Sequence, residues 1–177
     1  MPARLREGES MAHSDTSPLA PPPIRIGGLG LIQDPVGRIL MVRPTYDNPK
    51  GFFQLPGGGA GEGEPDWEAA IREVREETGL LVTPQRLLVK DWMPPRPHRA
   101  AGLNFVYDCG TAPGDIPIAL PPGEPPELDQ YRWIAPAHLD LHCAGYQALR
   151  VRAALHARAT GTLAELKRGL PIYTTVT

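Results

Sequence analysis

The sequence contains little cysteine, and it lacks both a long hydrophobic run and an excess of charge of either sign. Its two cysteines, Cys109 and Cys143, have neither a CxxC spacing nor histidines at metal-binding spacing beside them. A zinc site or a disulfide framework is therefore not expected, and we predict two reduced, buried thiols in a cytoplasmic protein. No apolar stretch approaches the ~18 residues of a membrane-spanning helix, and the amino-terminal segment lacks the apolar core of a signal peptide.

The charge balance limits the class of partner. The chain has 18 Lys and Arg against 20 Asp and Glu, which gives a net charge of −2. This balance favours neither a nucleic-acid polymer nor a membrane surface, whereas a small ligand remains compatible with it. With 177 residues, of which 41% are hydrophobic and 21% charged, the composition indicates one globular domain.

Half of the 22 prolines lie in two segments. The first, residues 1–23, is expected to be a disordered leader, and Met11 within it is an alternative start of translation. The domain proper then spans residues 24–177. The second segment, residues 110–126, is expected to be a long surface loop and a candidate lid over a substrate.

Between these segments, strand-like and helix-like patterns alternate, which predicts an α/β sandwich. Gly161 provides a stop for the last helix. The expected strands are residues 24–32, 38–42, 52–55, 87–92, 103–107 and 130–134, and the expected helices are residues 65–78 and 145–159.

The segment from residue 58 to residue 80 is strongly acidic, with seven acidic and two basic residues. On a helical wheel its apolar residues define a buried face, and three carboxylates fall on a separate arc beside that face. Like charges this close destabilise a helix unless a cation compensates them, and a hard divalent ion such as Mg²⁺ or Mn²⁺ suits carboxylate oxygens. A solvated acidic helix face is the competing interpretation. The apolar residues are Trp67, Ala70, Ile71 and Val74, and the carboxylates are Glu73, Glu76 and Glu77.

A glycine turn at residues 57–59 precedes this helix. Glycines leave backbone carbonyl and amide groups free to approach a metal or a phosphate where the helix begins. The turn therefore favours a metal or phosphate site over a merely solvated helix face.

The same segment resembles the Nudix box, G-x5-E-x7-R-E-U-x-E-E-x-G-U, in which U is aliphatic. The resemblance implies the Nudix fold, an α/β/α sandwich with a mixed central sheet. It also implies water attack at phosphorus, with Mg²⁺ or Mn²⁺ assisting, to cleave a pyrophosphate bond in a nucleoside diphosphate linked to another moiety. Every fixed position is matched, by Gly58, Glu64, Arg72, Glu73, Val74, Glu76, Glu77, Gly79 and Leu80.

Residue roles follow from this resemblance. Glu73, Glu76 and Glu77 would hold the metal, with the carbonyl of Gly57 or Gly58 as a further ligand. Arg72 would orient a glutamate, and Glu64 would support the junction of loop and helix. Glu77 is our first choice of general base, and Glu127, outside the box, is the alternative.

The substrate is less well specified. Arg43, Arg96 and Arg99 are candidates for phosphate contacts. Trp92, Phe105 and Tyr107 are candidates for stacking on a base, although core packing is expected for at least two of them. Nucleoside triphosphates, ADP-ribose and sugar nucleotides are the leading substrates.

Two alternatives to hydrolysis remain open: a Nudix-fold module that binds nucleotides without turnover, and a purely structural acidic helix. A homodimer that uses residues 162–177 is also compatible with the sequence.

Overall fold

The computed structural model describes residues 23–173, so almost all of the expected leader at residues 1–23 lies outside the described residues. The helices are α1 (Asp66–Thr78), α2 (Leu139–His142) and α3 (Gly145–Thr160), with a short 3₁₀ turn at Pro136–His138. The strands are β1 (Arg25–Gln33), β2 (Ile39–Pro44), β3 (Gly57–Gly59), β4 (Leu87–Met93), β5 (Gly102–Thr111), β6 (Leu128–Ile134), β7 (Ala164–Lys167) and β8 (Leu170–Pro171).

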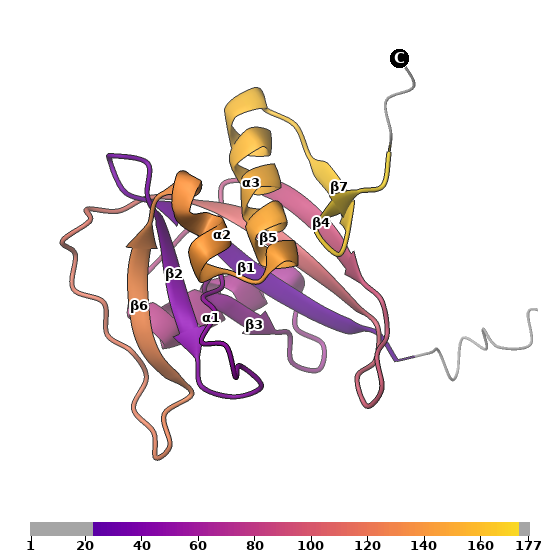
Figure 1. The fold of residues 1–177 in the computed structure, drawn as a ribbon, viewed down its shortest axis with the longest axis horizontal. Helices are drawn as coiled ribbons and strands as arrows, with labels where there is room; N and C mark the ends of the chain where they lie inside the picture. The colour runs from indigo at the N-terminus through magenta and orange to yellow at the C-terminus, as the bar shows by residue number, and fades with distance from the viewer. Residues whose placement is uncertain (1–22, 174–177) are drawn as a thin grey trace, which may run out of the picture.

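The strands form one mixed sheet in the order β6-β2-β1-β5-β4-β7-β8, and β3 pairs with β1 outside this path. The pairs β1–β5 and β4–β7 are parallel, whereas the other pairs are antiparallel. Helix α1 covers one face of the sheet, and α2 and α3 cover the other (Figure 1). The expected α/β/α sandwich with a mixed central sheet is therefore confirmed.

Each face of the sheet has its own hydrophobic core. Under α2 and α3, strand residues such as Leu31 and Met41 pack with alanines and Val151 of α3. Under α1, a smaller cluster contains Ile32, Leu40, Val74, Leu80 and Cys109. Because β1 lies in the middle of the sheet and is buried on both sides, its alternate residues contribute to both cores.

Helix α1 approaches the sheet closely because β1 presents a glycine beneath it. A Cβ atom at Gly28 would lie 2.5 Å from the backbone nitrogen of Ala70 and even nearer the carbonyl oxygen of Asp66. Only a residue without a side chain fits at this position. The contact places the carboxylates of α1 beside the backbone of β1 and β3.

Several expectations about local structure need correction. Trp67 is 49% exposed, because α1 contacts β1 through Asp66, Ala70 and Val74, and Trp67 lies to the side of this stripe. Residues 52–55 make isolated bridges to Val42 and Cys143 rather than a regular strand, and the third strand is Gly57–Gly59. Strands β7 and β8 were not expected, because they are only four and two residues long.

The proline-rich loop at residues 110–126 does not cover a cleft. Ile116 and Ile118 pack against the core under α1, and the amide of Ala119 donates to the carbonyl of Thr78 at a distance of 3.0 Å. The loop therefore fastens the carboxyl end of α1, which corrects the expectation of a lid.

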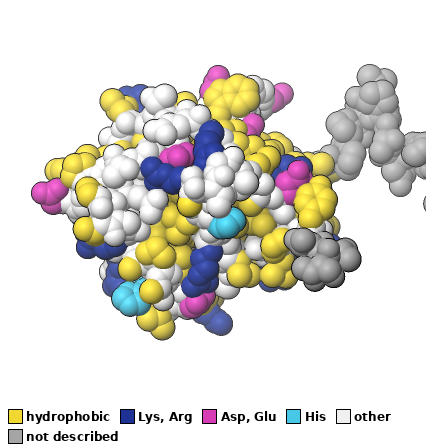
Figure 2. All heavy atoms as spheres, turned by 90° about the horizontal axis from the view of Figure 1, so that it is seen from above, with side chains coloured by type: hydrophobic (Ala, Val, Ile, Leu, Met, Phe, Trp, Pro, Cys, Tyr) yellow, Lys and Arg dark blue, Asp and Glu magenta, His cyan; other side chains and the backbone are white. Residues whose placement is uncertain are grey.

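Cys109 and Cys143 are both free and buried, as expected, and burial raises the pKa of the Cys143 thiol to about 11. No helix within residues 23–173 is both long and apolar enough to cross a membrane. Seen from above, the surface shows acidic side chains beside basic ones, with hydrophobic side chains scattered between them (Figure 2).

The contact at Gly28 leads to a stability prediction. Gly28→Ala should lower the free energy of unfolding by about 2 kcal/mol or more, because a methyl group would overlap the backbone of α1. Urea denaturation measures the difference. Gly145→Ala is the matched control, because a Cβ there meets nothing within 4 Å, and it should change stability by less than about 0.5 kcal/mol. Equal effects of the two substitutions would contradict the close contact.

Candidate active site

The site begins with the glycine strand β3. Gly57 and Gly58 pair with Leu29 and Gly28 of β1. Gly57 has a φ of 139°, which favours glycine, and a Cβ at that position would lie 2.6 Å from the Cα of Leu29. A Cβ at Gly58 would lie 2.5 Å from the carboxyl carbon of Glu73. The absence of side chains thus lets the backbone of β3 meet the carboxylates of α1 directly.

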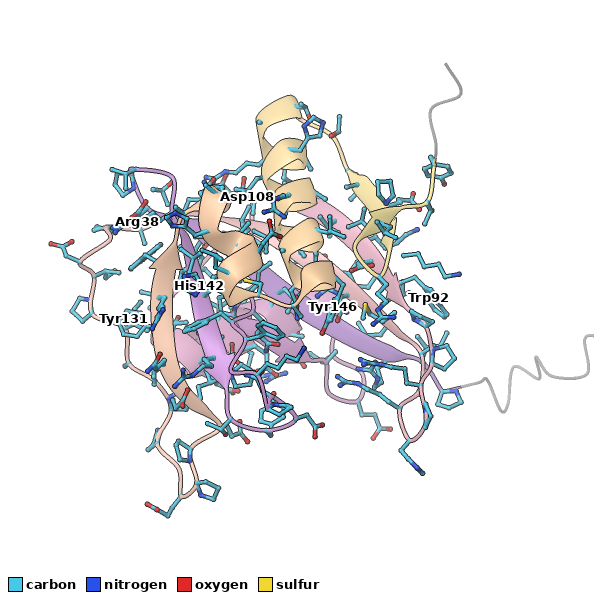
Figure 3. All side chains as sticks on the ribbon, viewed as in Figure 1. Arg38, Trp92, Asp108, Tyr131, His142 and Tyr146 are labelled. Atoms are coloured by element: carbon cyan, nitrogen blue, oxygen red, sulfur yellow. The ribbon has the colours of Figure 1, made fainter. Side chains whose placement is uncertain are left out.

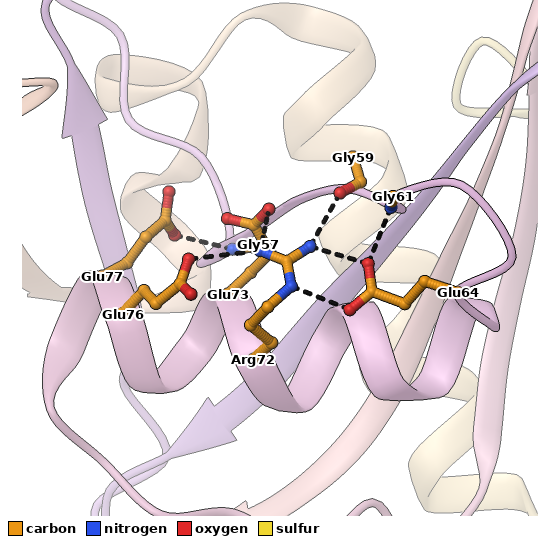
Figure 4. A network of polar contacts seen from close by, with 8 residues as sticks. All are labelled: Gly57, Gly59, Gly61, Glu64, Arg72, Glu73, Glu76 and Glu77. Atoms are coloured by element: carbon orange, nitrogen blue, oxygen red, sulfur yellow. Dashed lines mark hydrogen bonds and ion pairs between the residues drawn. The ribbon is translucent and has the colours of Figure 1, made fainter.

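Arg72 lies at the centre of the polar network between β3 and α1 (Figure 4). Its Nη1 donates to Glu73 at 2.9 Å and to Glu76 at 3.1 Å, and its Nη2 donates to the carbonyl of Gly59 at 2.9 Å. Its Nε and Nη2 both donate to Glu64 at 2.8 Å. One guanidinium therefore compensates three carboxylates and fixes the loop that carries the glycines.

Glu64 supports this junction, as the resemblance implied. Its Oε2 also accepts a hydrogen bond from the amide of Gly61 at 2.7 Å. The hydrogen bonds from Arg72 and Gly61 lower the pKa of Glu64 to about 2. This carboxylate stays ionised and ties α1 to the glycine loop.

Glu77 is in a different environment from the other carboxylates. Its Oε2 accepts a hydrogen bond from the amide of Gly57 at 2.7 Å, and the structure records no basic side chain paired with it within residues 23–173. Burial raises the pKa of Glu77 to about 8, and the charges of Glu73, Glu127 and Glu76 add to the increase. Burial also raises the pKa of Glu73, although Arg72 opposes that shift.

The carboxylates suit a divalent ion in chemistry but do not enclose one in their present conformation. Within residues 23–173, no three Asp, Glu, His or Cys side chains are spaced to hold a metal. Arg72 holds Glu73 and Glu76, and Gly57 holds one oxygen of Glu77. The oxygen donors, the space left by Gly58 and the half-buried Glu77 without a basic partner nevertheless fit Mg²⁺ or Mn²⁺.

A cleft of about 850 Å³ opens beside the glycine strand. Tyr46 and Phe52 line it from the loop after β2, and Asn104 lines it from β5. Tyr146, labelled in Figure 3, lines it from the start of α3. Sequence reasoning missed these four residues, because nothing in their local pattern distinguishes them from core or loop residues. Trp92, Phe105 and Tyr107 do not line the cleft.

Arg43 and Glu127, the predicted site residues outside the acidic segment, have different surroundings. Arg43 forms a bidentate ion pair with Asp129, with both distances 2.7 Å, and lies over the ring of Phe53. Its guanidinium is therefore already engaged. Glu127 is exposed just before β6, and its charge contributes to the raised pKa of Glu77.

Arg96 and Arg99 line the cleft from the turn between β4 and β5. Arg25, at the start of β1, lines the cleft with them and was not anticipated. The closeness of Arg25 to this turn follows from the parallel pairing of β1 with β5, which sequence alone does not reveal.

Comparison with known proteins identifies the family. Residues 23–154 match the family model described as NUDIX domain. The chain is 34% identical over 79 residues to an ADP-ribose pyrophosphatase of Methanocaldococcus jannaschii, a match that covers 45% of this chain and 47% of that protein. It is 31% identical over 117 residues to the nucleoside triphosphatase NudI of Escherichia coli O81, covering 59% of this chain and 79% of that protein. The chain thus spans about half the length of the first relative.

Solved structures share the fold. A MutT protein from Methanosarcina mazei Go1 superposes with a TM-score of 0.61 at 21% identity, covering 79% of this chain and 96% of that one. A UDP-X diphosphatase superposes with a TM-score of 0.63 at 17% identity, covering 81% and 67% of the two chains. These similarities confirm the architecture.

The raised pKa of Glu77 predicts a pH-dependent stability in the metal-free protein. Below about pH 4 the Glu77 carboxyl is protonated in both the folded and unfolded states, so its neutral form makes its full contribution to the free energy of unfolding. As the pH rises through the folded pKa of about 8, that contribution is lost. Glu77→Gln should therefore raise Tm by about 5 °C at about pH 8.5, and by about 1 °C or less at about pH 4.5.

Thermal unfolding in EDTA at the two pH values measures this effect. The exposed Glu62 provides the control, because Glu62→Gln should not change the pH dependence. If Glu77→Gln gave the same Tm change at both pH values, burial would not be the cause of the shift.

Proposed function

The chain belongs to the NUDIX family of hydrolases, and on this basis we propose that it is a divalent-metal-dependent enzyme that cleaves a pyrophosphate bond in a nucleoside diphosphate-linked small molecule. The observation that carries the proposal is the position of Glu77. A half-buried carboxylate with no basic partner in the described network lies beside the glycine strand that borders the cleft. Such a group, adjacent to further carboxylates, suits a cation and a phosphate substrate.

Glu73, Glu76 and Glu77 would hold Mg²⁺ or Mn²⁺, with a carbonyl of Gly57 or Gly58 as a further ligand. When bound, a divalent ion neutralises the charge on pyrophosphate oxygens and lowers the pKa of a water molecule. Release of Glu73 or Glu76 from Arg72 would free their oxygens for this role. Arg72 would then remain fixed by Glu64 and the carbonyl of Gly59.

Glu77 is our first candidate for the general base. Because Oε2 accepts the hydrogen bond from Gly57, Oε1 is left to take a proton from the attacking water. Glu127 is the alternative, since it comes from outside α1 and its charge acts on Glu77. Arg72 does not need to touch substrate in either case, because its donors are directed at carboxylates and at the loop.

The substrate we propose is a small nucleotide. The relatives are named as acting on ADP-ribose and on nucleoside triphosphates. Tyr46, Phe52 and Tyr146 offer aromatic surface in the cleft for a base or a sugar. A relative named RNA pyrophosphohydrolase, from Rhodopseudomonas palustris, is 32% identical over 123 residues, so triphosphorylated RNA belongs in the test panel although the net charge does not favour a polymer.

Removal of the proposed ligands should abolish catalysis. The double substitution of Glu76→Gln and Glu77→Gln should lower kcat by about 100-fold or more, because the charged oxygens that hold the ion are lost. EDTA should abolish turnover of the wild-type protein. Phosphate release with Mg²⁺ and then Mn²⁺ should be measured across nucleoside triphosphates, ADP-ribose, sugar nucleotides and triphosphorylated RNA.

Glu68→Gln is the matched control, because Glu68 lies on the same helix and is exposed. A kcat of the double variant within about threefold of wild type would overturn the metal-ligand assignment. Silence of the wild-type protein across the panel, with thermal stabilisation by a nucleotide, would indicate a binding module instead.

A further inference from the structure

Three arginines gather at one end of the cleft. Arg25 comes from the start of β1, and Arg96 and Arg99 come from the turn between β4 and β5. The amides of Arg96 and Arg99 donate to each other's carbonyl groups at 2.9 Å, which makes the turn tight. Arg25 holds this turn against β1, because its amide donates to the carbonyl of Ala101 at 2.9 Å and its Nε to that of Ala100 at 3.1 Å. These bonds fix the backbone that carries the three exposed side chains.

The part of the chain that the structure describes supplies no carboxylate counter-ion to this cluster. Within residues 23–173, none of these arginines forms an ion pair with a carboxylate within 4.0 Å, whereas Arg38, Arg43, Arg72, Arg150, Arg152 and Arg158 each do so. Burial, together with the charges of Arg99 and Arg96, lowers the pKa of Arg25. Positive charges held together in this way repel one another, and an anion from outside the chain would relieve that repulsion.

The three arginines line the cleft, whereas Glu73 and Glu77 lie against the glycine strand that borders it. The glycine segment at residues 57–61 lines the cleft between them, with the carboxylates of α1 on one side. Tyr46 lies within reach of both groups: burial and the charges of Glu77, Glu127 and Glu73 raise the pKa of its hydroxyl, and Arg99 opposes this increase. A substrate that extends past Tyr46 would meet the carboxylates at one end and the arginines at the other.

We propose that Arg25, Arg96 and Arg99 bind a phosphate group of the substrate that is separate from the two phosphates of the scissile bond. This inference rests on the proposed function, because the carboxylates beside the glycine strand are assigned there to the scissile pyrophosphate. The guanidinium group presents several donors in a plane and matches phosphate oxygens well. The enzyme then prefers nucleotides with an additional phosphate over ADP-ribose and sugar nucleotides, whose distal part is an uncharged sugar.

Two sources can supply that phosphate: a third phosphate in a polyphosphate chain, or a phosphomonoester on a ribose. Matched substrate pairs distinguish them. ATP and ADP differ by one phosphate in the polyphosphate. The substrates 2′-phospho-ADP-ribose and ADP-ribose differ by one phosphomonoester. We expect the wild-type enzyme to favour the more phosphorylated member of one pair by about 10-fold or more in kcat/KM.

The double substitution of Arg96→Gln and Arg99→Gln should reduce this preference to about twofold or less, mainly through KM, because the distal phosphate loses its donors. Arg99→Lys should retain part of the preference, since it keeps the charge but not the planar donor geometry. Lys167→Gln is the matched control, because Lys167 is exposed and does not line the cleft, and it should leave the preference unchanged.

A binding measurement without metal gives an independent readout. In EDTA, inorganic tripolyphosphate should raise the Tm of the wild-type protein and of Lys167→Gln, and it should not raise that of the Arg96→Gln, Arg99→Gln variant. Equal stabilisation of all three proteins would overturn the proposal.

The two proposals fail differently. Turnover without preference in either pair would overturn the arginine site and leave the hydrolase intact. Absence of any turnover would overturn the proposed function, while the tripolyphosphate measurement would still test the arginine cluster.

Discussion

The close contact between α1 and the glycines of β1 and β3 is the constraint on which the site depends. Gly28 lets the backbone of α1 lie directly on the sheet, and Gly58 leaves room for the carboxyl group of Glu73. A side chain at Gly28 would force the helix away from the sheet, and a side chain at Gly58 would displace the carboxyl group of Glu73. The hydrogen bond from Gly57 to Glu77 and the reach of Arg72 to Gly59 both require this short separation.

Charge compensation divides the carboxylates into two kinds. Arg72 forms ion pairs with Glu64, Glu73 and Glu76, which makes them part of the scaffold when no cation is bound. Glu77 accepts only a backbone hydrogen bond. Desolvation of its half-buried side chain therefore disfavours the charged form and raises its pKa to about 8. A divalent ion at this position would relieve that cost, which is the physical link between the stability of the helix and the proposed catalysis.

Much of the fold could be predicted from sequence, because strand and helix patterns are local. The two main helices, the approximate positions of five strands and the sandwich architecture follow from periodicity and glycine stops. The failures have tertiary causes. Trp67 fits the apolar stripe of α1 but lies to the side of the residues that contact β1. Residues of the 110–126 loop pack against the core under α1, and none of them lines the cleft.

By itself, the sequence determined that Arg72, Glu73, Glu76 and Glu77 share neighbouring positions on one helix, since the spacing of three and four residues is a property of the helical backbone. It also determined that a glycine turn precedes them. Only the tertiary structure decided which partner each carboxylate has, that Asp129 engages Arg43, and that Arg25 joins Arg96 and Arg99. These arrangements come from strand pairing and helix packing between distant segments, and no local spacing encodes them.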